Sequence, residues 1–198
     1  MLSEDTKLEV LHAHYVDTFG QIRRSLSLRD RLFTYIIIVI SAMFLQVVAP
    51  QNADAVLGKL LADKLGLSGP FSFIVLVTVL WFALLGFAIS YFQTVIYIER
   101  QYTYLHTLED LLNSYYGASA FTREGKSYLT NYPIFSNWTW IIYTVVFPAL
   151  IELVLGIKLA TEFCRASSFG VLLIFDVAIF AAITVSTALY LAAIHLQK

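Results

Sequence analysis

Four long apolar segments separate the polar parts of this 198-residue chain. Each is long enough to cross a hydrocarbon layer of about 30 Å as an α-helix rising 1.5 Å per residue. The segments are Leu32–Val48, Phe71–Ile98, Trp140–Ile157 and Phe169–Ile194. The pattern predicts an all-α fold, a four-transmembrane-helix integral membrane protein whose main partner is the lipid bilayer.

The composition supports this prediction and excludes several classes of protein. Apolar residues make up 59% of the chain and charged residues 14%, against about 45–50% and about 25% in soluble domains. A formal net charge of −1 gives no electrostatic footprint for a phosphate backbone, so we expect no direct nucleic acid binding. The single Cys164 excludes an intramolecular disulfide.

The basic residues predict the orientation of the chain. An even number of spans puts both termini on one side of the membrane, and nine of the thirteen Lys and Arg residues fall on that side: Lys7, Arg23, Arg24, Arg29, Arg31, Arg100, Arg123, Lys126 and Lys198. Such residues concentrate in cytoplasmic segments. The first 31 residues also lack the pattern of a cleavable signal peptide. We therefore expect both termini in the cytosol.

The polar N-terminal segment has the periodicity of an amphipathic helix. Thr6 and Glu9 have the spacing of a capping box. Apolar residues then recur every three or four positions, at Leu8, Leu11, Tyr15, Phe19, Ile22 and Leu26. This predicts a helix of about twenty residues, weakened by Gly20. Ser27 and Asp30 have the spacing of a second cap, which predicts that a new helix starts there and enters the membrane.

The second span predicts a helix that continues beyond the membrane. Gly and Pro are absent between Gly86 and Gly117, and an apolar seam runs through Ile98, Gln101, Leu105, Leu108, Leu112 and Tyr115. One helix from Phe71 to Tyr116 would be about 69 Å long, with its last ~27 Å in the cytosol. We expect it to pack on the N-terminal helix as a stalk. The alternative is a helix lying on the membrane surface, but the Lys-rich polar face typical of such helices is missing.

The resulting domain organisation has four parts. They are a cytosolic amphipathic helix (1–31), transmembrane helices 1 and 2 (32–98), a cytosolic helical extension with a loop over 118–137 (99–139), and transmembrane helices 3 and 4 (140–198). The apolar stripes of the stalk are candidates for docking a cytosolic protein partner, at Leu8, Leu11, Tyr15, Phe19, Leu105, Leu108 and Leu112.

Acidic residues inside the spans are the strongest candidates for chemistry, because an ionisable group in hydrocarbon costs about 3 kcal/mol or more without a partner. Glu152 and Asp176 qualify, and Gln93 is a further polar candidate for an ion pathway. From the expected span ends, Glu152 and Asp176 lie at nearly the same depth, where two carboxylates could share a proton. In the alternative interpretation each acid serves packing only, with Lys158 bonded to Glu152.

Small residues on two spans indicate close helix contact. They are Ala83, Gly86 and Ser90 in the second span, and Ala178, Ala182 and Ser186 in the fourth. The stripes fit either packing within the chain or contact between copies in an oligomer. Pro148 and Gly156 are candidates for kinks in the third span.

Other residues do not form a catalytic or metal-binding pattern. His12 and His14 are two residues apart and point to different sides of a helix. His106, His195 and Cys164 have no partner at metal-ligand spacing, and phosphate-binding glycine loops and nucleophile elbows are absent from the sequence. We therefore expect no enzyme activity, no cofactor and no metal site.

The layout resembles that of small multi-pass membrane effectors of bacterial antiphage defence systems. The residues that carry the resemblance are Tyr15 through Arg29-Asp30-Arg31 into the first span, the extension Glu99–Tyr116, and the loop from Arg123-Glu124-Gly125 to Tyr132-Pro133. The resemblance implies an oligomeric module of the bacterial inner membrane that a cytosolic sensor or nuclease activates. A sensor domain for a nucleotide messenger is missing from this chain, so a separate partner would have to supply it.

Three functional hypotheses follow. The first is a self-associating membrane effector that docks a partner through its stalk and gates or perturbs the bilayer. The second is a small ion channel or proton-coupled transporter that uses the intramembrane carboxylates. The third is a structural membrane scaffold.

Overall fold

The computed structural model describes residues 3–49, 56, 59, 63, 73–116, 134–165 and 170–196, and every regular element among them is helical. The elements are α1 (Glu4–Val48), α3 (Phe73–Tyr116), α5 (Ile134–Ile141), the π-helix η1 (Ile142–Val146), α6 (Phe147–Arg165) and α7 (Val171–Leu196). Four helices of this part of the chain are long and apolar enough to cross a membrane, with α5, η1 and α6 forming one of them. The predicted fold class is confirmed.

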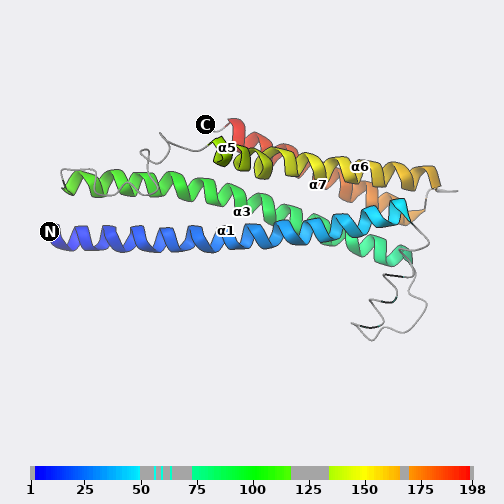
Figure 1. Ribbon diagram of the computed structural model, residues 1–198, viewed down its shortest axis with the longest axis horizontal. Helices are drawn as coiled ribbons and strands as arrows, with labels where there is room; N and C mark the ends of the chain where they lie inside the picture. Colours follow the sequence, from blue (N-terminus) through cyan, green and yellow to red (C-terminus); the bar gives the residue numbers. More distant parts are fainter. Residues whose placement is uncertain are drawn as a thin grey trace.

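The helices form a bundle at one end of the molecule and a two-helix extension at the other (Figure 1). Helices α1 and α3 run antiparallel along the whole length. The α5–η1–α6 helix and α7 cover only the part of α1 and α3 that lies away from the N-terminus. We call residues 4–22 of α1 and 100–116 of α3 the stalk, and the end of the bundle opposite the stalk the far end.

The two stalk helices pack on each other as predicted, and both apolar and polar contacts hold them together. Ile22, Leu105, Leu108 and Leu112 are buried between its two helices. The Tyr15 hydroxyl donates to Glu109 Oε1 at 3.1 Å, and this glutamate is almost fully buried. At the base of the stalk the Tyr97 hydroxyl donates to Gln21 Oε1 at 2.8 Å.

Helix α1 differs from its prediction, because it is one unbroken helix of 45 residues. Its N-cap is Ser3, whose hydroxyl accepts from the Thr6 backbone N–H, so the cap predicted at Thr6 is wrong. The second cap predicted at Ser27 is wrong too. The Ser27 hydroxyl donates to the Arg23 carbonyl one turn back, a bond that a serine inside a helix makes without ending it.

The third membrane helix is also longer than predicted. It begins at Ile134 rather than Trp140 and ends at Arg165 rather than Ile157. The predicted loop therefore ends before residue 134, and its remainder, with Gly117 and the loop residues of the antiphage resemblance, lies outside the described residues. So does most of the far-end connection 50–70, of which Val56, Lys59 and Asp63 are helical.

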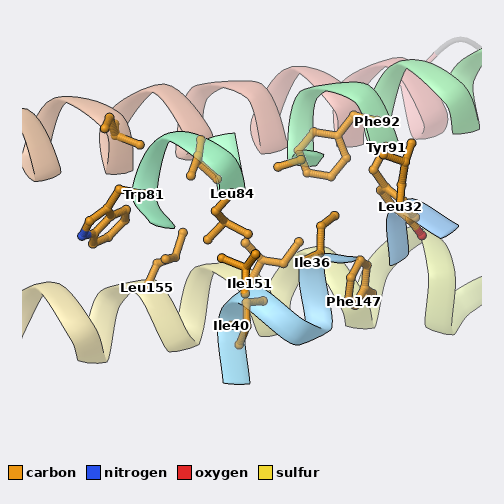
Figure 2. Packing of buried hydrophobic residues seen from close by; sticks show 14 of the residues in the cluster. Leu32, Ile36, Ile40, Trp81, Leu84, Tyr91, Phe92, Phe147, Ile151 and Leu155 are labelled. Atoms are coloured by element: carbon orange, nitrogen blue, oxygen red, sulfur yellow. The ribbon is translucent and has the colours of Figure 1, made fainter. Parts of the chain in front are cut away.

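The bundle is packed around large apolar side chains from all four membrane helices (Figure 2). Ile36 and Met43 of α1, Leu84 of α3, and Ile151 and Leu155 of α6 are fully buried. Aromatic rings join the helices at the stalk side, where the Phe92 ring stacks on the Tyr190 ring of α7 at 4.5 Å. These contacts fix the register of the helices and therefore the levels of the polar groups between them.

Gly20 provides a test of the continuous α1 helix. A Cβ atom added at Gly20 would meet no neighbouring atom within 4 Å, so Gly20→Ala should gain helix propensity without a clash. We expect the free energy of unfolding to rise by about 0.5–1 kcal/mol. The measurement is denaturation of the detergent-solubilised protein followed by circular dichroism.

The exposed Ala13 of the same helix supplies the reverse control, since Ala13→Gly should lower the free energy of unfolding by a similar amount. If Gly20→Ala destabilised the protein, α1 would be interrupted near that residue.

Candidate functional site

The π-helix η1 leaves one backbone carbonyl without a helical donor. The Phe147 N–H bonds to the Ile142 carbonyl, five residues back, instead of to the Tyr143 carbonyl, four residues back. The next donor in that pattern would be residue 148, which is a proline and has no N–H. The Tyr91 hydroxyl of α3 donates to the Tyr143 carbonyl instead, at 2.9 Å. The kink predicted at Pro148 is thus a local change from α-helical to π-helical hydrogen bonding. The Tyr91 hydrogen bond at this point joins α3 to the third membrane helix.

Glu152 is satisfied by hydroxyl groups of the neighbouring helix. Its Oε2 accepts from the Thr184 hydroxyl at 2.9 Å, and its Oε1 accepts from the Thr187 hydroxyl at 2.7 Å. These two hydrogen bonds join α6 to α7, and each carboxylate oxygen of Glu152 has a donor.

The expectation that Glu152 and Asp176 lie at one depth is wrong. Glu152 contacts Thr184 and Thr187, which follow Asp176 by eight and eleven residues, or about 12–17 Å along the helix. The prediction ended the third span at Ile157, whereas α6 continues to Arg165. The eight additional residues shift the level by about 12 Å.

A second charged group lies between α6 and α7 nearer the far end. Lys158 Nζ pairs with Glu162 Oε1 at 2.8 Å, with side-chain exposures of 7% and 18%. The alternative in which Lys158 bonds to Glu152 is therefore also wrong. Asp176 is 5% exposed and interacts electrostatically with both Glu162 and Lys158. We call Lys158, Glu162 and Asp176 the charged cluster.

Several buried polar atoms at this end have no hydrogen-bond partner among the described residues. They are Asp176 Oδ1, Trp81 Nε1, both amide atoms of Gln46 and, apart from the ion pair with Lys158, both carboxylate oxygens of Glu162. Figure 2 shows the Trp81 indole at the same end of the apolar core as Leu155, with its nitrogen turned away from the labelled side chains. Unsatisfied polar groups are costly in a low-dielectric interior. The far end therefore contains buried donors and acceptors that the described residues do not pair.

The small-residue stripes lie on the outside of the bundle. Gly86, Ser90, Ala178 and Ala182 are exposed, and Ala83 and Ser186 are half-buried. The polar candidate Gln93 is exposed on the same face of α3 as Gly86. Packing within the chain therefore does not account for the exposed members of either stripe.

The predicted docking residues instead occupy the interior of the stalk. Leu105, Leu108 and Leu112 are buried, and Leu8, Leu11, Tyr15 and Phe19 are half-buried. A partner could reach the three buried leucines only if α1 and α3 separated in the stalk.

The remaining candidates stay apart from these groups. His12, His14 and Cys164 are exposed, and the His195 ring lies edge-on against the Trp140 ring at 5.8 Å. His106 of the stalk stands beside the Tyr102 ring at 6.5 Å. Within the described residues, no group of three or more His, Cys, Asp or Glu side chains is placed to hold a metal ion.

Comparisons of the chain with protein-family models, with curated proteins and with solved structures gave no match.

Sequence reasoning identified Asp176, named Lys158 only as a possible partner of Glu152, and missed Glu162. Lys158 and Glu162 are four residues apart, the spacing at which opposite charges meet on a helix. That signal was available, but it requires the helix to continue past Ile157. The role of Tyr91 has no comparable signal, because it depends on a π-helix in another segment.

The Tyr91 hydrogen bond generates a stability prediction. Tyr91→Phe removes the hydroxyl that bonds to the Tyr143 carbonyl, and a buried unsatisfied carbonyl costs about 1–3 kcal/mol. We expect the free energy of unfolding in detergent to fall by that amount. Tyr35→Phe, at an exposed tyrosine of α1, is the matched control and should change it little.

Pro148→Ala should rescue this defect, because residue 148 would regain an N–H that can reach the Tyr143 carbonyl five residues back. Tyr91→Phe should therefore cost less in the Pro148→Ala background than in the native one. Equal costs in both backgrounds would contradict the assignment of Tyr91 to this carbonyl.

Proposed function

We propose that this multi-pass membrane protein is a subunit of an oligomer that gates or perturbs the bilayer it spans, under the control of a partner that acts on the stalk. Both termini lie in the cytosol in this proposal, as the basic residues predict. The oligomer and the stalk have separate supporting observations.

The outward-facing small residues of α3 carry the proposal. Gly86 and Ser90 form an exposed strip of small side chains on α3, and a Cβ atom added at Gly86 would meet nothing within 4 Å in a single copy. Small residues let helix backbones approach closely in lipid, where van der Waals contact and interhelical hydrogen bonds drive association. The strip supports contact between copies, because the four helices of one copy pack without it.

The continuity of α1 and α3 supports control from the stalk. Each helix runs unbroken from the stalk into the bundle. A partner that shifted the stalk helices relative to each other would therefore act directly on two of the four membrane helices. Such a partner would contact the outer faces of the stalk, since the seam between α1 and α3 is filled.

Gly86→Leu tests the oligomer. A bulky side chain on the strip should keep the helices of two copies apart, so the mass of the protein in lipid nanodiscs should fall toward that of one copy. Permeabilisation of dye-loaded liposomes by the protein should fall in parallel. Native mass spectrometry and dye release are the two measurements.

Ala149→Leu is the matched control, since Ala149 is an exposed small residue on α6 outside both stripes. It should leave mass and dye release unchanged. A wild-type protein that is monomeric in nanodiscs at every concentration would remove the oligomer from the proposal.

A proton-coupled transporter is the second candidate, and the charged cluster favours it over the structural scaffold. Charged side chains buried between membrane helices mark ion or proton pathways more often than simple packing. Both carboxylate oxygens of Glu152 accept from threonine hydroxyls, so the candidate acid in this proposal is Asp176. Liposomes with a pH gradient across the membrane and a pH-sensitive dye inside would detect transport.

The antiphage role implied by the resemblance is the most specific form of the proposal. Its test is the plating efficiency of phages on bacteria that express the chain together with its neighbouring genes. A reduction that disappears when residues 4–22 are deleted, with membrane insertion retained, would support both the role and the function of the stalk.

A further inference from the structure

One side of α3 is exposed along most of the helix. At about 100° per residue, positions that follow one another by seven or four residues lie on the same side of an α-helix. Such positions recur from the far end of the bundle to the tip of the stalk, about 54 Å in all, and each of them is exposed. We call them the α3 line, which consists of Val79, Gly86, Gln93, Tyr97, Tyr104, Leu111 and Tyr115.

In the stalk the α3 line is apolar although it faces water. Tyr104, Leu111 and Tyr115 are 47%, 47% and 48% exposed. They are separate from the leucines that α3 buries against α1, and α6 and α7 cover only the part of α3 that lies away from the tip of the stalk (Figure 1). A helix with one partner needs one apolar stripe, so a second stripe on α3 indicates a second partner.

Within the bundle the α3 line carries one polar side chain, that of Gln93. It is exposed, and its amide makes no hydrogen bond to any described residue. It lies five residues before Ile98, the end of the predicted span, and therefore faces hydrocarbon, where an unpaired amide is costly. Side chains of this type join membrane helices by hydrogen bonding across them. Gln93 therefore indicates a partner that offers a donor and an acceptor at the same level.

The partner has to match the α3 line in length. A soluble protein would cover only the stalk part, and a membrane helix without an extension would cover only the bundle part. A helix that crosses the membrane and continues into the stalk covers both, and α3 of a second copy is such a helix. Copies inserted in the same orientation hold their α3 helices parallel, so each position of the line meets the same level of the other copy.

The α3 line is also complementary to itself. A glutamine amide both donates and accepts, so two copies related by a two-fold axis can satisfy each other at Gln93. Arg100 is the charged residue of α3 nearest to the line, and its long side chain can turn to the membrane surface. Helix α1 of a second copy has the required length too, but the outer side of its stalk part is charged, with exposed Glu9, Asp17, Arg23 and Arg24.

We propose that two copies of this chain pack α3 against α3, in parallel, along the α3 line, with the two Gln93 side chains hydrogen-bonded to each other in the membrane and with Tyr104 and Leu111 in apolar contact in the stalk. The inference rests on the oligomer proposed above, and it adds a specific register and the stalk to the contact between copies. The charged outer side of α1 remains uncovered in this arrangement and can receive the partner that acts on the stalk.

Disulfide cross-linking of the full chain in membranes tests the stalk part of this contact. Cys164→Ser removes the one native cysteine, and single cysteines are then introduced as Tyr104→Cys or Leu111→Cys. Because each position of the line meets its own copy, we expect both variants to form a disulfide-linked dimer on oxidation. Asp110→Cys is the matched control, since Asp110 is exposed beside Leu111 but is turned by about 100°, and it should give little dimer.

The mass of the Cys164→Ser protein in lipid nanodiscs separates the two ways in which the test can fail. An oligomer without cross-links at positions 104 and 111, or with equal cross-linking at position 110, would overturn the α3 contact and leave the oligomer of the proposed function in place. A protein that is monomeric at every concentration would overturn both.

Gln93→Leu tests the membrane part. Leucine suits a side chain that faces lipid, so the fold of one copy should be retained while the hydrogen bonds between copies are lost. We expect the dissociation constant, measured by energy transfer between labelled copies in liposomes, to rise about threefold to tenfold. Gln93→Asn keeps the amide and should retain most of the association. Association of Gln93→Leu as strong as that of the wild-type protein, or an equal loss in Gln93→Asn, would contradict the Gln93 pair.

Discussion

The hydrocarbon surroundings of the bundle cannot hydrogen-bond to it, so every polar group between the membrane helices must find its partner in the protein. Three contacts show how the chain meets this constraint. The Tyr91 hydroxyl covers the carbonyl freed by the π-helix, two threonine hydroxyls cover Glu152, and Lys158 pairs with Glu162. The first two contacts join neighbouring helices and therefore fix the register in which the apolar side chains pack. The third joins two turns of α6. Asp176, Trp81 and Gln46 depart from the pattern, since Asp176 Oδ1, Trp81 Nε1 and both Gln46 amide atoms are buried without a hydrogen-bond partner among the described residues.

The sequence predicted the parts of the fold that depend on composition and periodicity. Apolar length gave the four spans, and the seam through Leu105, Leu108 and Leu112 gave the stalk, because a stripe that continues past the membrane needs another helix to cover it. Helix ends were less predictable. A serine can cap a helix or, as Ser27 does, bond to a carbonyl one turn back inside the helix, and the local sequence does not distinguish the two. At Ile157 the hydropathy falls while the helix continues, since the ion pair lets charged residues stay inside.

The errors at the candidate site follow from the wrong end predicted for the third membrane helix. The depth of an acid is counted from the end of its helix, so an error of eight residues at the end of α6 paired Glu152 with the wrong part of α7. The same error gave Lys158 the wrong partner, Glu152, and hid Glu162, which the prediction placed beyond the membrane surface. The nature of Asp176 as a buried acid was predictable from its place in a long apolar segment. Its neighbours depend on helix register, which side-chain contacts between helices determine and which a single sequence does not contain.

The stalk and the bundle share the helices α1 and α3, and specific side-chain contacts join these helices to the third membrane helix. In the stalk, α1 and α3 hold each other through buried leucines and the Tyr15–Glu109 bond. Where the third membrane helix begins to cover them, Arg29 of α1 lies 4.3 Å from the centre of the Tyr143 ring, and Trp140 donates to Glu99 of α3 at 3.1 Å. Both partners are on or next to the π-helix, where backbone bonding already departs from the α pattern. A movement of α1 against α3 would therefore reach the third membrane helix at the segment whose backbone hydrogen bonds already differ from those of a regular helix.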